Sequence, residues 1–214
     1  ALAAAQAASA TRGLQEDFES KALKILNQAQ TDANPNPINS QSHRKVGSGT
    51  NNTIAPRDFI LMKLAFDKAE VPLGGRVAIV DPVCEATLNL GFTGTYSVDK
   101  NPQIQSVMET GFADEHNFVM NFASWSVITS NRLDKGTFSD GTTSVTDGVA
   151  NVFMSALSDQ HTPLMAAWRR MPSVEQGRDQ DLQRDKYTMS CRFGIGAQRT
   201  DTLGILITDA TLFE

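Results

Sequence analysis

The stretch TIAPRDFILMKLAFDKAEVPLGGRVAIVDPVCEATL, residues 53–88, decides the fold that the sequence predicts. It begins with a helix: Thr53 can cap the N-terminus, Pro56 fits the first turn, and Asp58 complements the positive end of the helix dipole. Apolar residues then recur at helical spacing, so this helix should bury one broad face. Those residues are Phe59, Met62, Phe66 and Ala69, with Leu61, Leu64 and Ala65 beside them.

The second half of the stretch predicts a core strand. A proline and two glycines between positions 72 and 75 end the helix. Residues 76–80 follow as a short apolar run, rich in β-branched side chains and bounded by breakers, which is typical of a buried strand. Asp81-Pro82 ends that run and starts a second helix. The predicted unit is therefore helix, tight turn, core strand, helix.

Length and composition set broad limits on the function. The 214 residues are enough for one large or two small domains with a hydrophobic core. The formal net charge of −5 argues against a dedicated nucleic-acid binder, which usually carries a basic stripe. No run of about 18 apolar residues is present, so no membrane span is predicted. Cys84 and Cys191 lack metal-ligand spacing, and both are interpreted as small buried apolar residues.

A long helix is predicted from about Leu2 to Gln30, ended by the prolines at positions 35 and 37. Its narrow apolar stripe consists of Leu14, Phe18, Ala22, Ile25 and Ala29. A helix of this length spans roughly 40 Å, which suits either a coiled-coil partner or a spine laid across a sheet. Only about two heptads of the pattern are present, so the spine is favoured.

Residues 39–52, rich in Ser, Gly, Asn and Gln, predict a loop. His43-Arg44-Lys45 forms a small basic cluster within this loop. Such a cluster can contact phosphate, but a solvated loop tip is the favoured interpretation.

The middle of the chain predicts two strands with an irregularity between them. Apolar residues alternate along 118–122 and again along 125–129, with an odd offset that places a β-bulge or sharp bend near Ala123. Residues 134–148 predict either a surface loop or a pair of hairpin strands.

The last third of the chain predicts a closing pair of strands. Residues 162–168 can start a helix, and residues 171–184 predict a charged, turn-like region. Strict alternation along 187–195 predicts a strand, and 203–208 predicts another.

The search for catalytic or metal-binding motifs finds none. The three histidines lie in unrelated contexts, and the densest cluster, Asp114-Glu115-His116, is interpreted as an exposed turn. GxSxG, P-loop and HExxH motifs are absent from the sequence. The bare GxG at 194–196 lies in a strand-like segment, so its glycines are interpreted as bends. The sequence therefore predicts no catalytic, cofactor-binding or metal-binding residues and no enzyme.

One alternative enzyme hypothesis rests on Asp81. A buried strand ending in an acid occurs in nucleotide-binding α/β folds, where the acid binds a ribose hydroxyl. This alternative predicts a ligand pocket at Asp81, but the glycine-rich phosphate loop of those folds is missing.

The order of these parts resembles the major capsid protein of tailed bacteriophages, which has the Hong Kong ninety-seven fold. The long helix and the loop after it resemble the family's spine helix. ILMKLAFDKAEVPLGGRVAIVDPVCEATL resembles the helix, turn, core strand and helix at the heart of its axial domain. FVMNFASWSVITSNRL and DKYTMSCRFGIGAQRTDTLGILITDA are similar to the family's strand with a Ser-Asn turn and to its closing strands.

The resemblance implies an α+β fold with a spine helix and two domains. Residues 1–52 and 171–214 would form the peripheral domain, to which the final strand returns, and residues 53–170 the axial domain. In the family an N-terminal arm and an extended β-hairpin loop precede the spine helix; here nothing precedes it, so both are expected to be absent from this chain.

The resemblance also implies a function and partners. The chain would be a structural subunit that assembles with itself into pentamers and hexamers of an icosahedral capsid. It would meet portal, scaffolding and possibly decoration proteins, and would enclose double-stranded DNA without sequence-specific binding, in a virion assembled in the host cytoplasm. A non-viral compartment shell of the same fold is the second alternative.

Charges of alternating sign are the candidate inter-subunit contacts in such a shell. They are Arg178, Asp179, Asp181, Arg184 and Asp185. Ion pairs there would give register more than affinity. A solvated turn is the alternative interpretation of the same residues.

Overall fold

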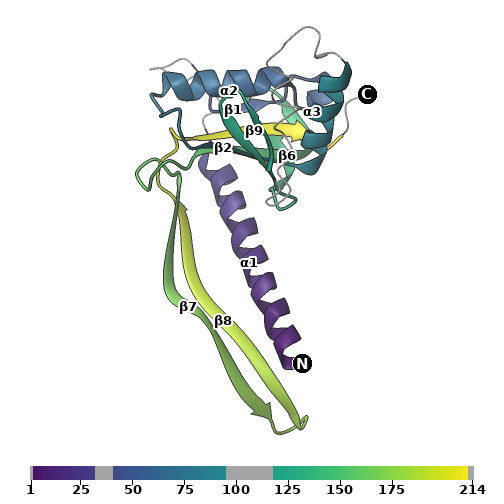
Figure 1. Cartoon of the computed structure of the whole chain (residues 1–214), viewed down its shortest axis with the longest axis vertical. Helices are drawn as coiled ribbons and strands as arrows, with labels where there is room; N and C mark the ends of the chain where they lie inside the picture. The colour runs from purple at the N-terminus through teal and green to yellow at the C-terminus, as the bar shows by residue number, and fades with distance from the viewer. Residues whose placement is uncertain (1, 32–40, 95–117, 212–214) are drawn as a thin grey trace.

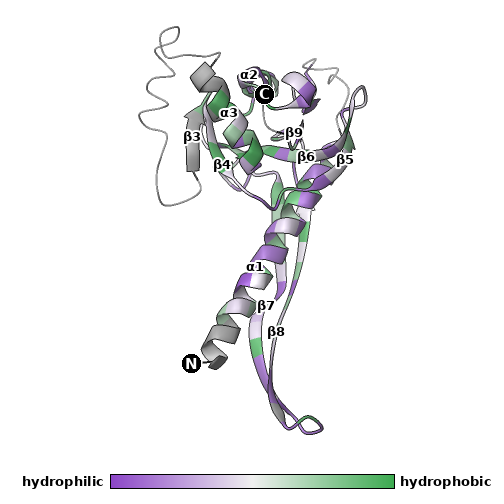
Figure 2. Ribbon diagram, turned by 90° about the vertical axis from the view of Figure 1, so that its right-hand side faces the viewer, coloured by the Kyte–Doolittle hydropathy of each residue, from purple (hydrophilic) through white to green (hydrophobic). Residues whose placement is uncertain are grey.

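The computed structural model describes residues 2–31, 41–94 and 118–211. These residues form a head, in which helices cover a mixed sheet, and a leg that projects from it (Figure 1). The leg consists of helix α1 (Leu2–Ala29) and a long hairpin of strands β7 (Leu164–Asp179) and β8 (Arg184–Ala197). Within the leg, α1 and the hairpin run side by side in both ribbon views (Figure 2).

The head sheet has the strand order β1-β9-β6-β2-β4-β3, with β5 paired to β6. The strands are β1 (Arg44–Val46), β2 (Arg76–Val80), β3 (Phe118–Phe122), β4 (Trp125–Thr129), β5 (Lys135–Ser139), β6 (Ser144–Ser155) and β9 (Leu203–Asp209). Strand β2 is parallel to β4, and β1 is parallel to β9. The other pairs are antiparallel.

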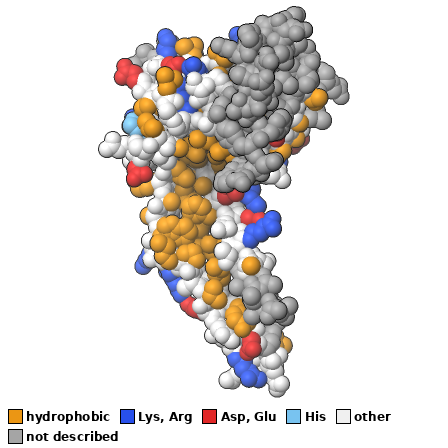
Figure 3. All heavy atoms as spheres, viewed as in Figure 1, with side chains coloured by type: hydrophobic (Ala, Val, Ile, Leu, Met, Phe, Trp, Pro, Cys, Tyr) orange, Lys and Arg blue, Asp and Glu red, His pale blue; other side chains and the backbone are white. Residues whose placement is uncertain are grey.

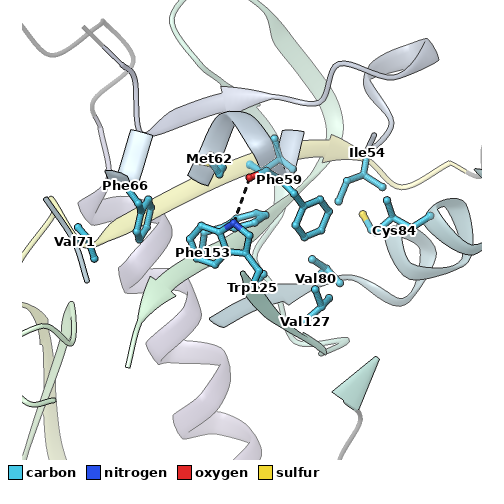
Figure 4. Close-up of a cluster of buried hydrophobic side chains, with 13 residues drawn as sticks. Ile54, Phe59, Met62, Phe66, Val71, Val80, Cys84, Trp125, Val127 and Phe153 are labelled. Atoms are coloured by element: carbon cyan, nitrogen blue, oxygen red, sulfur yellow. Dashed lines mark hydrogen bonds between the residues drawn. The ribbon is translucent and has the colours of Figure 1, made fainter. Parts of the chain in front are cut away.

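Helices α2 (Pro56–Lys68) and α3 (Pro82–Gly94) cover one face of this sheet. Phe59 and Phe66 of α2 pack with Trp125 and Phe153 from the strands, and the ring centroids of Trp125 lie 4.9 Å from Phe66 and 5.0 Å from Phe153 (Figure 4). These contacts are edge to face, the preferred aromatic geometry. The indole Nε1 of Trp125 donates a hydrogen bond to the Phe59 carbonyl at 3.3 Å, so no polar atom of this ring is left unsatisfied.

The C-terminal half of α1 covers the opposite face. Leu23 and Leu26 are buried there in a cluster with residues of β6 and β9, including Val152, Leu203 and Ile205. Because both faces of the sheet are covered, nearly every residue of β9 is buried rather than every second one.

The central unit predicted from residues 53–88 is confirmed. Helix α2, strand β2 and helix α3 follow in that order, and the predicted long helix is α1. In the turn before β2, Gly75 has φ +68°, and a Cβ atom there would lie 2.8 Å from the backbone of Leu157. Gly75 is thus required both by its backbone conformation and by a close approach.

Arg76 joins this turn to the core. Its side chain is fully buried, with the guanidinium over the rings of Phe66 and Trp125 at 5.7 and 5.8 Å. It donates to the carbonyls of Val71 at 2.6 Å and Pro72 at 3.0 Å, and Nη2 pairs with Asp67 at 2.7 Å. These bonds satisfy carbonyls that follow the end of α2.

One prediction near α2 is wrong in detail, namely that Thr53 caps this helix. The N-cap is Ala55, since the Thr53 hydroxyl donates to the Thr50 carbonyl instead, within the short 3₁₀ helix Thr50–Asn52. The Asp58 carboxylate accepts the Ala55 N–H at 2.9 Å. Burial raises the pKa of Asp58, opposed by hydrogen bonds from Ser48 and Ala55.

The basic cluster 43–45 is not a solvated loop tip. Arg44 and Lys45 belong to strand β1, which pairs with β9, and His43 is buried with its ring 5.7 Å from that of Phe66. A three-residue strand has no periodicity of its own, so only its partner strand reveals it.

The irregularity near Ala123 is a hairpin turn between β3 and β4, in which Ala123 and Ser124 have positive φ angles. Of the two alternatives for 134–148, the hairpin is found, as β5 and the start of β6. The second helix of the predicted unit, α3, continues to Gly94. The predicted helix stop at 34–37 and the cluster at 114–116 lie outside the described residues.

The largest correction concerns the leg. The helix predicted from 162 and the charged turn predicted over 171–184 are instead β7 and the end of the hairpin. Most of β7 is exposed on both faces, so burial imposes no alternation on its sequence. The strand is defined by its ladder to β8.

The division into peripheral and axial domains stays a prediction. Strand β9 lies in the head sheet between β1, which belongs to the residues assigned to the peripheral domain, and β6, which belongs to those assigned to the axial domain.

Candidate assembly surface

The leg is held together by an apolar seam between α1 and one face of the hairpin. Phe18 of α1 stacks on Trp168 of β7 with centroids 5.4 Å apart and meets Phe193 of β8 edge on at 5.1 Å. Along β8, Cys191, Phe193 and Ile195 are half-buried, while the residues between them are exposed. Cys191 is therefore only half-buried, unlike the prediction. Figure 3 shows the hydrophobic side chains gathered along the leg.

An acidic face of α1 is bonded to the turn after β4. Arg132 pairs with Glu16 at 2.8 Å and with Glu19 at 3.2 Å, and the Ser130 hydroxyl donates to Glu19 at 2.7 Å. Hydrogen bonds from Arg12 and Arg132 lower the pKa of Glu16. These contacts fix the side of α1 that faces the head.

The C-terminal end of α1 is clamped by Arg44 of β1. Its Nη1 donates to the carbonyls of Asn27 at 3.1 Å and Gln30 at 3.0 Å, and to the Asn27 side-chain oxygen at 3.0 Å. Its Nε donates to the Ser139 carbonyl at 2.8 Å. A cation at this end also complements the helix dipole. Burial of the guanidinium lowers the pKa of Arg44.

A second set of bonds joins the same end to β9. The Gln30 amide donates to the carbonyls of Thr200 at 2.9 Å and Leu203 at 2.6 Å. Asn27 donates to Asp134 at 2.8 Å. The direction in which α1 leaves the head is therefore set by polar contacts from three separate segments.

The structure brings the predicted inter-subunit residues together at the far end of the hairpin, here called the hairpin tip (residues 178–185). In the ladder, Arg178 lies opposite Asp185 and Asp179 opposite Arg184. Between them, Leu182 is 61% exposed and its N–H donates to Asp179 at 3.3 Å. The tip thus carries both charge signs around one exposed apolar side chain. Its role in contacts between subunits stays a prediction.

A groove beside α1 is a feature that the sequence did not predict. This leg groove has a volume of about 680 Å³. It is lined by Lys21, Lys24, Ile25 and Gln28 of α1 and by Arg169 and residues 191–195 of the hairpin. Residues more than 140 positions apart meet in it, so no local pattern could have indicated it.

Asp81, on which the alternative enzyme hypothesis rests, makes contacts within the fold of the chain. Its carboxylate accepts the Val83 N–H at 3.1 Å at the start of α3, and it lies 3.3 Å from the Lys135 ammonium. Its own N–H donates to Asn151 at 2.9 Å. Asp81 lines neither the leg groove nor the hollow between α1 and β5. The enzyme alternative is therefore not supported.

The described residues hold neither a metal-binding cluster nor a membrane-spanning helix. Within the described residues no three His, Cys, Asp or Glu side chains cluster as a metal site requires. No helix in the described part of the chain is long and apolar enough to cross a membrane. The buried Cys84 thiol lies 3.2 Å from the Thr208 hydroxyl, and burial raises its pKa to about 11.

Comparison with known proteins gives one family and several structural neighbours. The family model described as phage capsid protein matches residues 1–208. No curated protein matches the chain.

Three of the solved structures that the chain resembles come from two phages and a bacterium. A structure from Mycobacterium phage Che8 has TM-score 0.62 and 20% identity, over 96% of this chain and 63% of that one. The capsid structure of cyanophage P-SCSP1u has TM-score 0.60 and 18% identity, over 95% and 64%. The holo-SrpI encapsulin complex from Synechococcus elongatus has TM-score 0.60 and 12% identity, over 98% and 66%. The chain thus spans about two thirds of the length of these neighbours, or slightly less.

Proposed function

The chain belongs to the phage capsid protein family and has the Hong Kong ninety-seven fold of a structural capsid subunit, and on that premise we propose that it assembles with itself into pentamers and hexamers of an icosahedral shell. In this proposal the chain has no enzymatic activity. The shell is the capsid of a virion, it encloses double-stranded DNA, and it forms in the host cytoplasm.

The observation that carries the proposal is the exposed leg. A two-stranded ribbon is marginal in water unless something packs on it, and α1 covers only part of this one. Large apolar side chains remain exposed along the hairpin, from 38% to 68%. They are Met165, Trp168, Met171, Val174, Leu182 and Tyr187. Neighbouring subunits that cover this ribbon would remove that surface from water, and many weak repeated contacts add up under closed symmetry.

The charges of the hairpin tip fit a role in register. Surface ion pairs contribute little affinity but penalise wrong pairings, which suits subunits that must meet in one arrangement. Reversing one charge, as in Asp185→Lys, should lower the yield of closed particles while leaving the fold of the subunit intact. Unchanged assembly of the full-length variant would remove the tip charges from this proposal.

Further partners follow from the same premise. A shell that packages DNA needs a portal and usually a scaffold, and decoration proteins are a further class of partner. The chain's net charge of −5 favours enclosing DNA without tight or sequence-specific binding, since tight binding requires many cations at the phosphates.

A non-viral compartment shell is the second candidate. It is favoured by the likeness to an encapsulin complex, which matches the fold over 98% of this chain. At 12% identity that likeness concerns the fold alone, so both kinds of shell share the proposed self-assembly.

The test is negative-stain electron microscopy of the full-length gene product purified from cells, with its mass from light scattering. Closed particles, or free pentamers and hexamers, are expected. The ratio of nucleic acid to protein in the particles separates a DNA-filled capsid from a compartment. A product that stays a monomer or dimer at all salt concentrations would refute self-assembly.

A further inference from the structure

The leg groove carries more positive charge than its surroundings neutralise. Lys21, Lys24, Arg169 and Arg192 line it, and no Asp or Glu is among its lining residues. Lys21 pairs with Asp17 at 2.6 Å. Within the described residues, the side chains of Lys24, Arg169 and Arg192 form no hydrogen bond or ion pair. Lys24 and Arg169 thus line the groove without a counter-charge among the described residues, whereas Arg192 lies between Cys191 and Phe193 on β8, so its side chain projects from the other face of the strand.

The floor of the groove is apolar. Ile25 of α1 and Phe193 and Ile195 of β8 are half-buried there, next to Cys191. An occupant that matches this surface needs an apolar side chain with carboxylates beside it. A nucleic-acid backbone supplies the negative charge but not the apolar group, so a protein segment fits better.

The hairpin tip has the complementary chemistry. Leu182 is 61% exposed at its end, and Asp181 beside it is exposed and has no partner among the described residues. Asp179 and Asp185 flank the same turn. Arg178 and Arg184 lie opposite Asp185 and Asp179 in the ladder, so Asp181 is the tip carboxylate without an opposite charge across the strands. One exposed apolar side chain beside this carboxylate thus projects from one end of the leg, while an apolar groove bordered by cations lies nearer the head.

The tip cannot reach the groove of its own chain. Arg169 and Asp179 lie on one extended strand, and ten residues of strand span about 33 Å. We therefore propose that the hairpin tip docks in the leg groove of a second copy of the chain, with Leu182 on the apolar floor and Asp181 between Lys24 and Arg169.

This contact joins two different surfaces, so it is heterologous, and such contacts generate rings or continuous lattices rather than closed pairs. The inference rests on the proposed self-assembly and names the two surfaces that one shell contact would use. The groove volume of about 680 Å³ is within the range that holds several side chains.

Disulfide cross-linking tests the contact directly, because Cys191 already lines the groove. The full-length Leu182→Cys variant is assembled, treated with a mild oxidant and run on a non-reducing denaturing gel. Each chain can then form one disulfide through the cysteine introduced at its tip and a second through Cys191 in its groove, each with a different neighbouring chain. A ladder of covalent dimers, trimers and larger species is therefore expected. Buried Cys84 should not compete.

The matched control is Leu182→Cys combined with Cys191→Ser. The cross-linked fraction of the single variant should exceed that of this control at least tenfold. A ladder that survives Cys191→Ser, cross-linking that stops at dimers, or assembled particles without cross-links would each overturn the inference.

A charge swap covers the case in which the cysteine variant does not assemble. Asp181→Lys and Lys24→Glu should each lower the particle yield at least tenfold, and the double variant should restore it. Arg57→Glu, an exposed charge reversal on α2, is the control and should have no effect. Single variants that assemble like the wild type, or a double variant without recovery, would refute the docking. Wild-type protein that never assembles would refute self-assembly itself, which keeps the two failures apart.

Discussion

Replacing Arg44 with methionine should loosen the attachment of α1 to the head. One guanidinium donates to Asn27 and Gln30 at the end of the helix and to Ser139 of β5, at distances of 2.8 to 3.1 Å. Methionine keeps most of the aliphatic packing but supplies no donor. The variant therefore removes the clamp while leaving the core in place.

The expected cost is about 3 to 4 kcal/mol. Each of the three backbone carbonyls that lose a donor accounts for about 1 kcal/mol, because half-exposed acceptors regain some water. Loss of the cation at the helix end adds about 0.3 to 1 kcal/mol. Arg44→Lys keeps the charge but not the forked geometry, so it should recover about half of this cost.

The assay is hydrogen exchange of the α1 backbone in unassembled protein, with urea unfolding followed by tryptophan fluorescence. A loss of 3 kcal/mol corresponds to roughly a hundredfold faster exchange where local opening governs the rate. The control is Arg12→Met, whose exposed side chain bonds to Glu16 on its own helix and to no other residue in the described part of the chain. That change should cost about 0.5 kcal/mol or less. If Arg44→Met costs less than 1 kcal/mol, or no more than Arg12→Met, the clamp does not hold α1.

Arg76→Met should lower the free energy of unfolding by about 3 kcal/mol or more, because two carbonyls and a carboxylate lose their donor. Asp67→Asn should lower it by about 1 kcal/mol or less, because the Asp67 carboxylate is 40% exposed. Equal losses for the two variants in urea unfolding would contradict this. Gly75→Ala should cost about 2 kcal/mol or more, since it combines φ +68° with a 2.8 Å approach, while Gly177→Ala, with no atom within 4 Å of its Cβ, should be nearly neutral by thermal unfolding. The pKa of Glu16 is lower in the folded than in the unfolded protein. Its ion pairs therefore stabilise the fold fully at a pH above the unfolded-state pKa of Glu16, and this stabilisation is lost as the pH falls through the folded-state pKa. Stability measured from pH 7 down to 3 should therefore fall less steeply in Glu16→Gln, and an unchanged slope would show that these ion pairs contribute nothing.

Sequence reasoning worked best where a segment carries its own periodicity. Helix α2, strand β2 and helix α3 are all bounded by breakers and buried on a defined face, so spacing and punctuation alone place them. The same holds for β8, whose alternate residues contact α1. Burial imposes the pattern, and the pattern can then be recognised in the sequence.

It failed where an element depends on a distant partner. Residues 171–179 have no alternation because β7 is exposed on both faces, and β1 is too short to have a period. The clamp residue Arg44 looked like part of a solvated loop, because its partners lie at positions 27, 30 and 139. The tip charges were recognised as a group, but their place at the end of a projecting ribbon was not.

The sequence by itself determined the spine helix, the central unit of residues 53–88 and, by the order of these parts, the family. Tertiary structure alone decided that residues 164–197 form a hairpin along α1, that β1 and β9 lie in the head sheet, and that Lys24 and Arg169 line one groove. The physical reason is range. Helical spacing and turn chemistry act over a few residues, whereas a strand ladder or a groove is defined by groups that only the folded chain brings together.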